Sequence, residues 1–257
     1  MDSKTKTSVS RVTTYKQCPR KYYYRYIKKL PVFDFWPQLI KGNFVHYVLD
    51  NWVCRLIRGE NPREGMLAAY RDTFVLNEFN GKVSKFLEEI KPWLRQAVSD
   101  YEARQFQPIA AEEKVSFRYR KLEVTGRIDR IDTISSTKIK IIDYKTTKNP
   151  DYLTAMQLGV YHIGVKYGSL KEQYGNKDVE TAYVLLRQDM REIPYVFRED
   201  ELEGILTEVE EVVDLIGNDT TWEPKPSKLC QYCDFFVPCT QERGSCNFDF
   251  DVNAFEF

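Results

Sequence analysis

The stretch GRIDRIDTISSTKIKIIDYKTTK, residues 126–148, constrains the fold of this 257-residue chain more than any other segment. Its β-branched and aromatic residues, interleaved with polar ones, predict two consecutive strands joined by a short turn. The first strand carries Asp129, and the second ends in Asp143, with Lys145 two residues later. Two carboxylates can hold a hard divalent cation, and a nearby lysine can hold or polarise the attacking water. The segment therefore predicts metal-assisted phosphodiester hydrolysis.

Hydrophobic periodicity on either side predicts the remaining elements. Residues 8–107 carry apolar positions at helical spacing, including an amphipathic helix that is expected to begin at Gly42 and to bury Cys54. At about residue 110 the period changes to that of strands. Beyond the two strands the sequence predicts, in order, a helix at 152–167, strands at 181–188 and 192–199, and an acidic helix at 199–217. This order predicts an α/β (α+β) core at 110–217 behind a helical region.

Composition places the chain among globular proteins, with 42% hydrophobic and 30% charged residues. No apolar run reaches the length of a membrane span, and the N-terminus lacks the apolar core of a secretion signal, so a cytoplasmic protein without membrane contact is expected. The net charge is zero, but residues 1–30 carry nine Lys or Arg against one acid, and residues 199–223 carry ten acids. A basic face suited to phosphates and two solvated helices of opposite charge explain this distribution equally well.

The basic N-terminal segment is also rich in tyrosine. Tyr22, Tyr23, Tyr24 and Tyr26 are interspersed with basic residues behind Pro19, which suits the first turn of a helix. Such rings can stack on bases while the cations bind phosphates. A packing face with snorkelling cations is an equally good explanation.

Five motifs in a fixed order resemble the PD-(D/E)xK nuclease superfamily. There an acid on one strand is followed by D/E-x-K on the next, as are Asp129 and Asp143-Tyr144-Lys145 here. Three further motifs resemble the RecB-like branch: the opening CPRKYYYRY at 18–26, G-x-x-x-H at Gly42 and His46, and Q-L-x-x-Y at Gln157, Leu158 and Tyr161. The resemblance covers nearly the whole chain.

This resemblance implies a restriction-endonuclease-like mixed sheet flanked by helices, with one or two divalent cations at the active site. The implied ligands of Mg²⁺ or Mn²⁺ are His46, Asp129, Asp143 and the Tyr144 carbonyl. Lys145 would lie near the attacking water and the scissile phosphate. Further implied roles are DNA contact or orientation of Lys145 for Gln157 and Tyr161, and support of the site for Glu113.

For several of these residues, a purely structural role is an alternative to a role in the active site. Asp129 is also explained as a surface acid paired with a neighbouring arginine, and Asp132 is a reserve ligand. Lys145 is also explained by pairing with Asp143, and Tyr161 by packing. His162 adjoins the helix face of Gln157 and Tyr161 without sharing it, which favours a structural role.

Cysteine spacing points to a second metal group. Cys230-x2-Cys233-x5-Cys239 offers three thiolates, and Cys18 can supply a fourth if the chain ends meet, with Cys246 as runner-up. The spacing resembles the iron–sulfur members of the RecB-like branch, which include CRISPR adaptation exonucleases, the AddB nuclease domain and related phage exonucleases. It implies a [4Fe–4S] cluster that joins the two ends of the chain, with tetrahedral zinc as the less favoured alternative.

The resulting hypothesis is a metal-dependent DNA exonuclease that prefers single-stranded ends and acts in recombination, repair or CRISPR adaptation. The alternatives are a non-catalytic DNA-end-binding accessory subunit and a structure-specific endonuclease. The single domain would span 1–257, with a helical region at 8–107, the core at 110–217 and a cysteine segment at 222–246. No GxxxxGK[ST] motif is present, so any unwinding of DNA is expected to come from a partner. A helicase or an integrase is a candidate protein partner. The tail at 247–257 suits either an edge strand or a docking peptide, and a viral origin suits the sequence as well as a cellular one.

Overall fold

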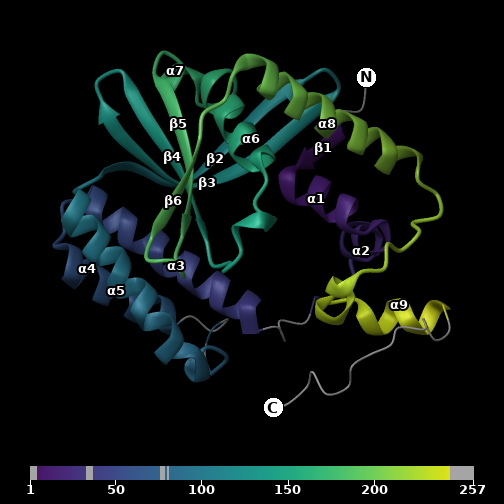
Figure 1. Cartoon of the computed structure of the whole chain (residues 1–257), viewed down its shortest axis with the longest axis horizontal. Coiled ribbons are helices and arrows are strands. Elements are labelled where there is room, and N and C mark those ends of the chain that lie inside the picture. The colour runs from purple at the N-terminus through teal and green to yellow at the C-terminus, as the bar shows by residue number, and fades with distance from the viewer. Residues whose placement is uncertain (1–4, 33–36, 76–78, 80, 244–257) are drawn as a thin grey trace.

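The computed structural model describes residues 5–32, 37–75, 79 and 81–243, and its strands form one mixed sheet (Figure 1). The sheet runs in the order β1-β3-β4-β5-β6, with β2 paired to β3. The strands are β1 (Thr5–Ser8), β2 (Gln107–Tyr119), β3 (Leu122–Ser135), β4 (Lys138–Lys145), β5 (Asp178–Leu185) and β6 (Arg191–Tyr195). The helices are α1 (Val9–Gln17), α2 (Pro19–Tyr22), α3 (Pro37–Ile57), α4 (Pro62–Phe74), α5 (Leu87–Arg104), α6 (Ala155–Lys166), α7 (Lys171–Tyr174), α8 (Glu199–Asn218) and α9 (Phe236–Arg243).

Strand pairing confirms the predicted mixed sheet. β2, β3 and β4 form an antiparallel meander, β5 runs parallel to β4, and β6 runs antiparallel to β5. The parallel pairing of β1 with β3 was not predicted. Four residues directly ahead of a helix are too short to show the alternation by which strands are recognised.

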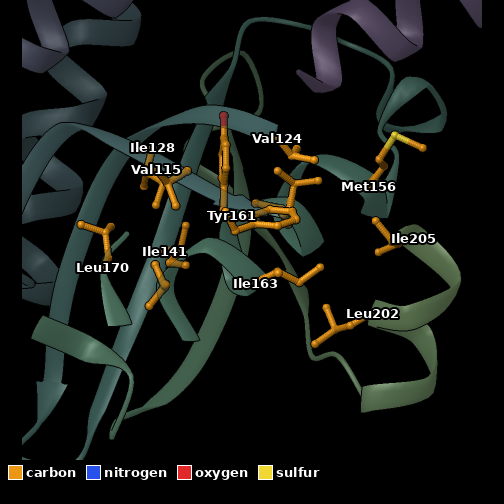
Figure 2. Close-up of a cluster of buried hydrophobic side chains, with 14 of the residues drawn as sticks. Val115, Val124, Ile128, Ile141, Met156, Tyr161, Ile163, Leu170, Leu202 and Ile205 are labelled. Carbon is orange, nitrogen blue, oxygen red and sulfur yellow. The ribbon is translucent and has the colours of Figure 1, made fainter. Parts of the chain in front are cut away.

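Helices cover both faces of the sheet. On one face α6 and α8 bury an apolar cluster, in which Figure 2 shows the Tyr161 ring among Val115, Ile128 and Ile141. On the other face α3, α4 and α5 bury Trp52 against strand residues that include Ile142. Each fully buried side chain of this size contributes roughly 1.5–3 kcal/mol, so the sheet is held between two cores.

Two expectations about α3 were wrong. The helix begins at Pro37, not at Gly42, because proline is favoured in the first turn and the added turn buries Ile40. Cys54 is exposed, because the helical period turns Val53 and Leu56 inward and leaves position 54 facing solvent. Among the helices that the structure describes, none combines the length and apolar character that a bilayer span requires.

The N-terminal helices α1 and α2 lie beside the C-terminal part of the described chain, which includes α9 (Figure 1). The Tyr22 ring stacks on Trp222 at 5.9 Å between centroids, and Tyr23 does so at 5.5 Å. Tyr22 and Tyr24 are only 4% and 1% exposed. Of the two explanations for the tyrosine segment, the structure therefore supports packing for Tyr22 and Tyr24, because buried rings are unavailable to bases.

Close packing of α6 on β2 depends on Gly164. A Cβ at this position would lie 1.9 Å from Cγ2 of Val115, well inside van der Waals contact. We expect Gly164→Ala to lower the free energy of unfolding by about 1–3 kcal/mol, measured by urea denaturation. Gly204 in α8 has open space around it, so Gly204→Ala is the matched control and should gain about 1 kcal/mol. Equal effects of the two substitutions would contradict this packing.

Candidate active site

Two carboxylates face each other on adjacent antiparallel strands. Arg130 on β3 pairs with Ile142 on β4, which sets Asp129 opposite Asp143. The backbone N–H of Tyr144 donates to Oδ2 of Asp129 at 2.7 Å, and Asp143 is only 2% exposed. Burial, and next the charge of Asp143, raise the pKa of Asp129 well above its ordinary value. A bound cation would neutralise both carboxylates, so this pair fits a divalent metal by burial as well as by donor type.

Lys145 is held by two polar neighbours. Its Nζ lies 2.6 Å from Oδ2 of Asp143 and donates to Oε1 of Gln157 at 2.9 Å. The amide Nε2 of Gln157 donates in turn to Oδ1 of Asp143 at 2.7 Å and to the Tyr161 hydroxyl at 2.7 Å. Gln157 and Tyr161 share a face because they lie one turn apart on α6. Gln157 thereby connects the ammonium group to the carboxylate and orients both.

Tyr161 contacts the site from the apolar core. Its hydroxyl lies 3.4 Å from Oδ1 of Asp143, and the ring is 4% exposed. Burial raises the pKa of Tyr161, so the hydroxyl stays neutral. Gly126 on β3 allows this approach, because a Cβ there would lie 2.8 Å from Cε1 of Tyr161. The Tyr161 side chain therefore both packs in the apolar core and contacts the site.

His46 reaches the carboxylates from α3. Its Nδ1 lies 3.4 Å from Oδ2 of Asp129. Burial lowers the pKa of His46, which favours the neutral imidazole that binds metal ions. One turn earlier, a Cβ on Gly42 would lie 3.4 Å from Oγ1 of Thr146, which is an ordinary van der Waals contact. The i, i+4 spacing of G-x-x-x-H places both residues on the face of α3 that meets the sheet.

The acid beside the site is Glu112, and the expectation for Glu113 was wrong. Glu112 lines a cavity of about 210 Å³ together with His46, whereas Glu113 interacts electrostatically with Tyr174 on α7. The backbone of Glu112 is left-handed, with φ of 51°. Glu113 lies two residues before Val115 and shares its face, which α6 covers, whereas Glu112 lies on the opposite face with His46. Strand alternation was the signal that could have distinguished the two adjacent glutamates.

Asp132 and His162 lie in surroundings that give them structural roles outside the candidate site. Nε of Arg130 lies 3.0 Å from Oδ1 of Asp132, and both side chains are almost fully buried. Asp132 is therefore an ion-pair partner and not the reserve ligand. The His162 ring lies edge-on to Phe197 at 5.9 Å, as its structural assignment predicted.

The free energy of unfolding should depend on pH through His162. Burial lowers the pKa of His162 from 6.5 to about 4, so the folded protein holds the neutral ring. The neutral ring contributes to the free energy of unfolding in full above the pKa of the unfolded state, about 6.5. This contribution is lost as the pH falls towards 4, and it amounts to at most about 3 kcal/mol. We expect thermal melts of wild type and His162→Gln to differ in slope between pH 6.5 and 4, with the variant less sensitive. Identical slopes would refute this.

Four cysteines from both ends of the chain line one small cavity. Cys18, Cys230, Cys233 and Cys239 surround about 40 Å³. The backbone N–H of Lys225 donates to Sγ of Cys18 at 3.4 Å, and a similar bond reaches Sγ of Cys230 at 3.3 Å. The donor set fits a thiolate-bound metal, and Cys246 lies outside the described residues. Within the described ranges, no set of three or more His, Cys, Asp or Glu side chains meets the spacing of a formed metal site.

Facing carboxylates on adjacent strands, a lysine two residues on and a helix histidine define the active site of one class of nuclease. The family model described as the PD-(D/E)XK nuclease superfamily matches residues 6–240. The chain therefore belongs to the PD-(D/E)XK nuclease superfamily, and the predicted resemblance is confirmed at that level.

The chain is also similar to a sequence relative and to solved structures of low identity. It is 29% identical over 180 residues to a subunit of the ATP-dependent helicase/deoxyribonuclease of Clostridium acetobutylicum, and the match covers 55% of this chain and 15% of that protein. The fold is similar to that of a candidate exonuclease from Eubacterium rectale, with a TM-score of 0.51, 13% identity, and coverage of 88% of this chain and 86% of the other. The crystal structure of SSO0001 gives a TM-score of 0.41 at 15% identity, covering 92% and 86%.

Proposed function

We propose that this protein is a metal-dependent DNA exonuclease that prefers single-stranded ends. The observation that carries the proposal is the convergence of His46, Asp129, Asp143 and Lys145 where the C-terminal end of β4 lies beside β3. These are the residue types that phosphodiester hydrolysis needs, with carboxylates for a cation and an ammonium group for the phosphate or the water. Superfamily membership supports nuclease chemistry.

Each residue of the site would have its own role in the reaction. His46, Asp129, Asp143 and the Tyr144 carbonyl would hold Mg²⁺ or Mn²⁺, which lowers the pKa of a bound water and stabilises charge on the phosphate. Gln157 holds Lys145 through its Oε1, so the ammonium group is oriented before substrate binds. The neutral Tyr161 hydroxyl adds a polar contact to Asp143 without adding charge.

We further propose that Cys18, Cys230, Cys233 and Cys239 hold a [4Fe–4S] cluster, with zinc as the less favoured alternative. Their shared cavity and the N–H···S bonds from Lys225 and Ser227 support a thiolate site. Hydrogen bonds to the ligand sulfurs are part of the surroundings of bound iron–sulfur clusters. The cluster would join the ends of a single nuclease domain, with residues 222–246 closing onto Cys18.

The biological setting is proposed from the relative. Similarity to part of a helicase/deoxyribonuclease supports a role in recombination or repair beside a helicase partner, while CRISPR adaptation beside an integrase rests on the cysteine spacing. A cytoplasmic setting follows from this role. The second candidate is an accessory subunit that binds DNA ends without cleaving them, and the convergence of His46, Asp129, Asp143 and Lys145 argues against it.

The deciding experiment uses anaerobically purified protein with single- and double-stranded DNA labelled at either end. Linear and circular substrates are compared in Mg²⁺, Mn²⁺ and EDTA. Metal-dependent loss of linear single strands supports the exonuclease and gives its polarity. Cleavage of circles would indicate an endonuclease, and binding without cleavage in every metal would indicate the accessory subunit.

A further inference from the structure

The cavity that Glu112 and His46 line opens beside the carboxylate site, on the side of α3. Asn43, Tyr47 and Asp50 line it from successive turns of that helix, and Glu112 and Arg127 line it from the sheet. His46 borders it as well, and the same histidine lies 3.4 Å from Asp129. The cavity of about 210 Å³ is therefore in direct contact with the proposed catalytic centre.

Tyr47 is the unusual residue in this cavity. It remains 47% exposed, whereas Phe44 on the preceding turn is fully buried. The Phe79 ring packs on Tyr47 at 5.4 Å between centroids with an interplanar angle of 71°. This edge contact fixes the tyrosine side chain. A fixed, half-exposed aromatic ring offers a flat surface on which another planar group can stack.

Charge decides which part of a nucleic acid suits the cavity. Arg127 is already paired with Glu112 at 2.8 Å, so the lining carries an excess carboxylate at Asp50. A phosphate would be repelled here. An uncharged base would not be, and carboxylates accept hydrogen bonds from exocyclic amines while the Asn43 amide both donates and accepts.

We propose that this cavity binds the nucleobase adjacent to the scissile phosphate, with the base stacked on Tyr47. The proposal rests on the nuclease function proposed above and specifies its substrate. A base can enter the cavity only when it is unpaired and unstacked from its neighbours, which selects single-stranded or frayed DNA. Tyr47 is thus a base-binding residue that sets strand preference.

The test combines a protein variant with a substrate variant. Tyr47→Ala should raise KM for a single-stranded oligonucleotide by about 5- to 100-fold, with kcat changed far less, because stacking is lost from substrate binding. A series of oligonucleotides with one abasic position near the end should contain one substrate on which wild type shows the same loss. On that substrate Tyr47→Ala should cost nothing more. Tyr47→Phe should restore most of the affinity, because the ring is kept.

Controls separate this proposal from its competitors. Tyr167 is 57% exposed and lines a different cavity, so Tyr167→Ala is the matched surface control and should leave KM unchanged. If Tyr47→Ala raises KM by the same factor on every abasic substrate as on normal DNA, Tyr47 has a structural role and the proposal is overturned. A drop in bound Mn²⁺ in Asp50→Asn, with no difference between normal and abasic DNA, would identify a second cation site instead.

The proposal can fail separately from the nuclease function. If wild type cleaves nothing, the nuclease proposal fails, and binding of normal and abasic strands by fluorescence anisotropy still tests the cavity. Weaker binding of one abasic strand by wild type, absent in Tyr47→Ala, supports it. Equal binding of all strands overturns it.

Discussion

Asp143→Asn is expected to reduce DNA cleavage by roughly 10³- to 10⁴-fold, because a metal-held carboxylate is worth several kcal/mol in the transition state. Asparagine keeps the shape of the side chain but removes the charge that attracts the cation and pairs with Lys145 at 2.6 Å. The metal-free protein should not be destabilised, since the substitution also relieves repulsion between Asp143 and the buried Asp129. Cleavage of end-labelled DNA and thermal melting measure the two effects. In wild type, Mn²⁺ should raise the melting temperature more than in the variant.

Asp132→Asn is the matched control. Asp132 is as buried as Asp143, at 2% exposure, but its partner is Arg130 at 3.0 Å. Its removal leaves a buried guanidinium without its counter-ion, which should cost about 3–5 kcal/mol of stability. Activity per folded molecule should persist. Full activity in Asp143→Asn would show that Asp143 is not a catalytic residue. Loss of activity in a folded Asp132→Asn would show that Asp132 has a role in catalysis.

The second large effect is expected from Cys18→Ser. If four thiolates hold a cluster, this change removes the ligand from the N-terminal segment, and a metal-binding free energy on the order of 10 kcal/mol no longer contributes in full to folding. Part of the contact survives, because Tyr22 and Tyr23 still stack on Trp222. We expect loss of brown colour and iron, and a melting temperature lower by on the order of 10 °C.

Cys54→Ser provides the comparison for this experiment. Cys54 is exposed on α3 and lies apart from the cysteine cavity, so iron content should not change and stability should stay within about 0.5 kcal/mol. Colourless anaerobic protein that contains zinc would replace the iron–sulfur assignment by a zinc site. Equal stability of Cys18→Ser and wild type, with no metal in either, would remove the joining role altogether.

Periodicity made most of the fold predictable. The meander of β2 to β4, the helix with Gln157 and Tyr161 on one face, and α8 all follow from patterns within a single element. The errors fall where no such pattern exists. β1 is too short, and the added first turn of α3 depends on the burial of Ile40 in the core that α3, α4 and α5 share.

Strand register made the central pair of acids predictable as well. Pairing of β3 and β4 as an antiparallel hairpin brings the two acids close, and a register shift between Thr133 and Ser135 sets Asp129 opposite Asp143 instead of Tyr144. For the acid from β2 the available signal was strand alternation: Glu113 shares the face of Val115, which α6 covers, and Glu112 lies on the opposite face with His46.

The sequence by itself determined the residue types at the site and the elements that carry them, because strand and helix periods are local properties of the chain. Tertiary structure alone decided which of those side chains meet. Gly126 lets Tyr161 approach β3, Gln157 turns its amide between Lys145 and Asp143, and Tyr47 stays exposed in the cavity that His46 borders. These relations depend on packing between segments far apart in the chain, where a shift of an ångström is decisive and no sequence pattern records it.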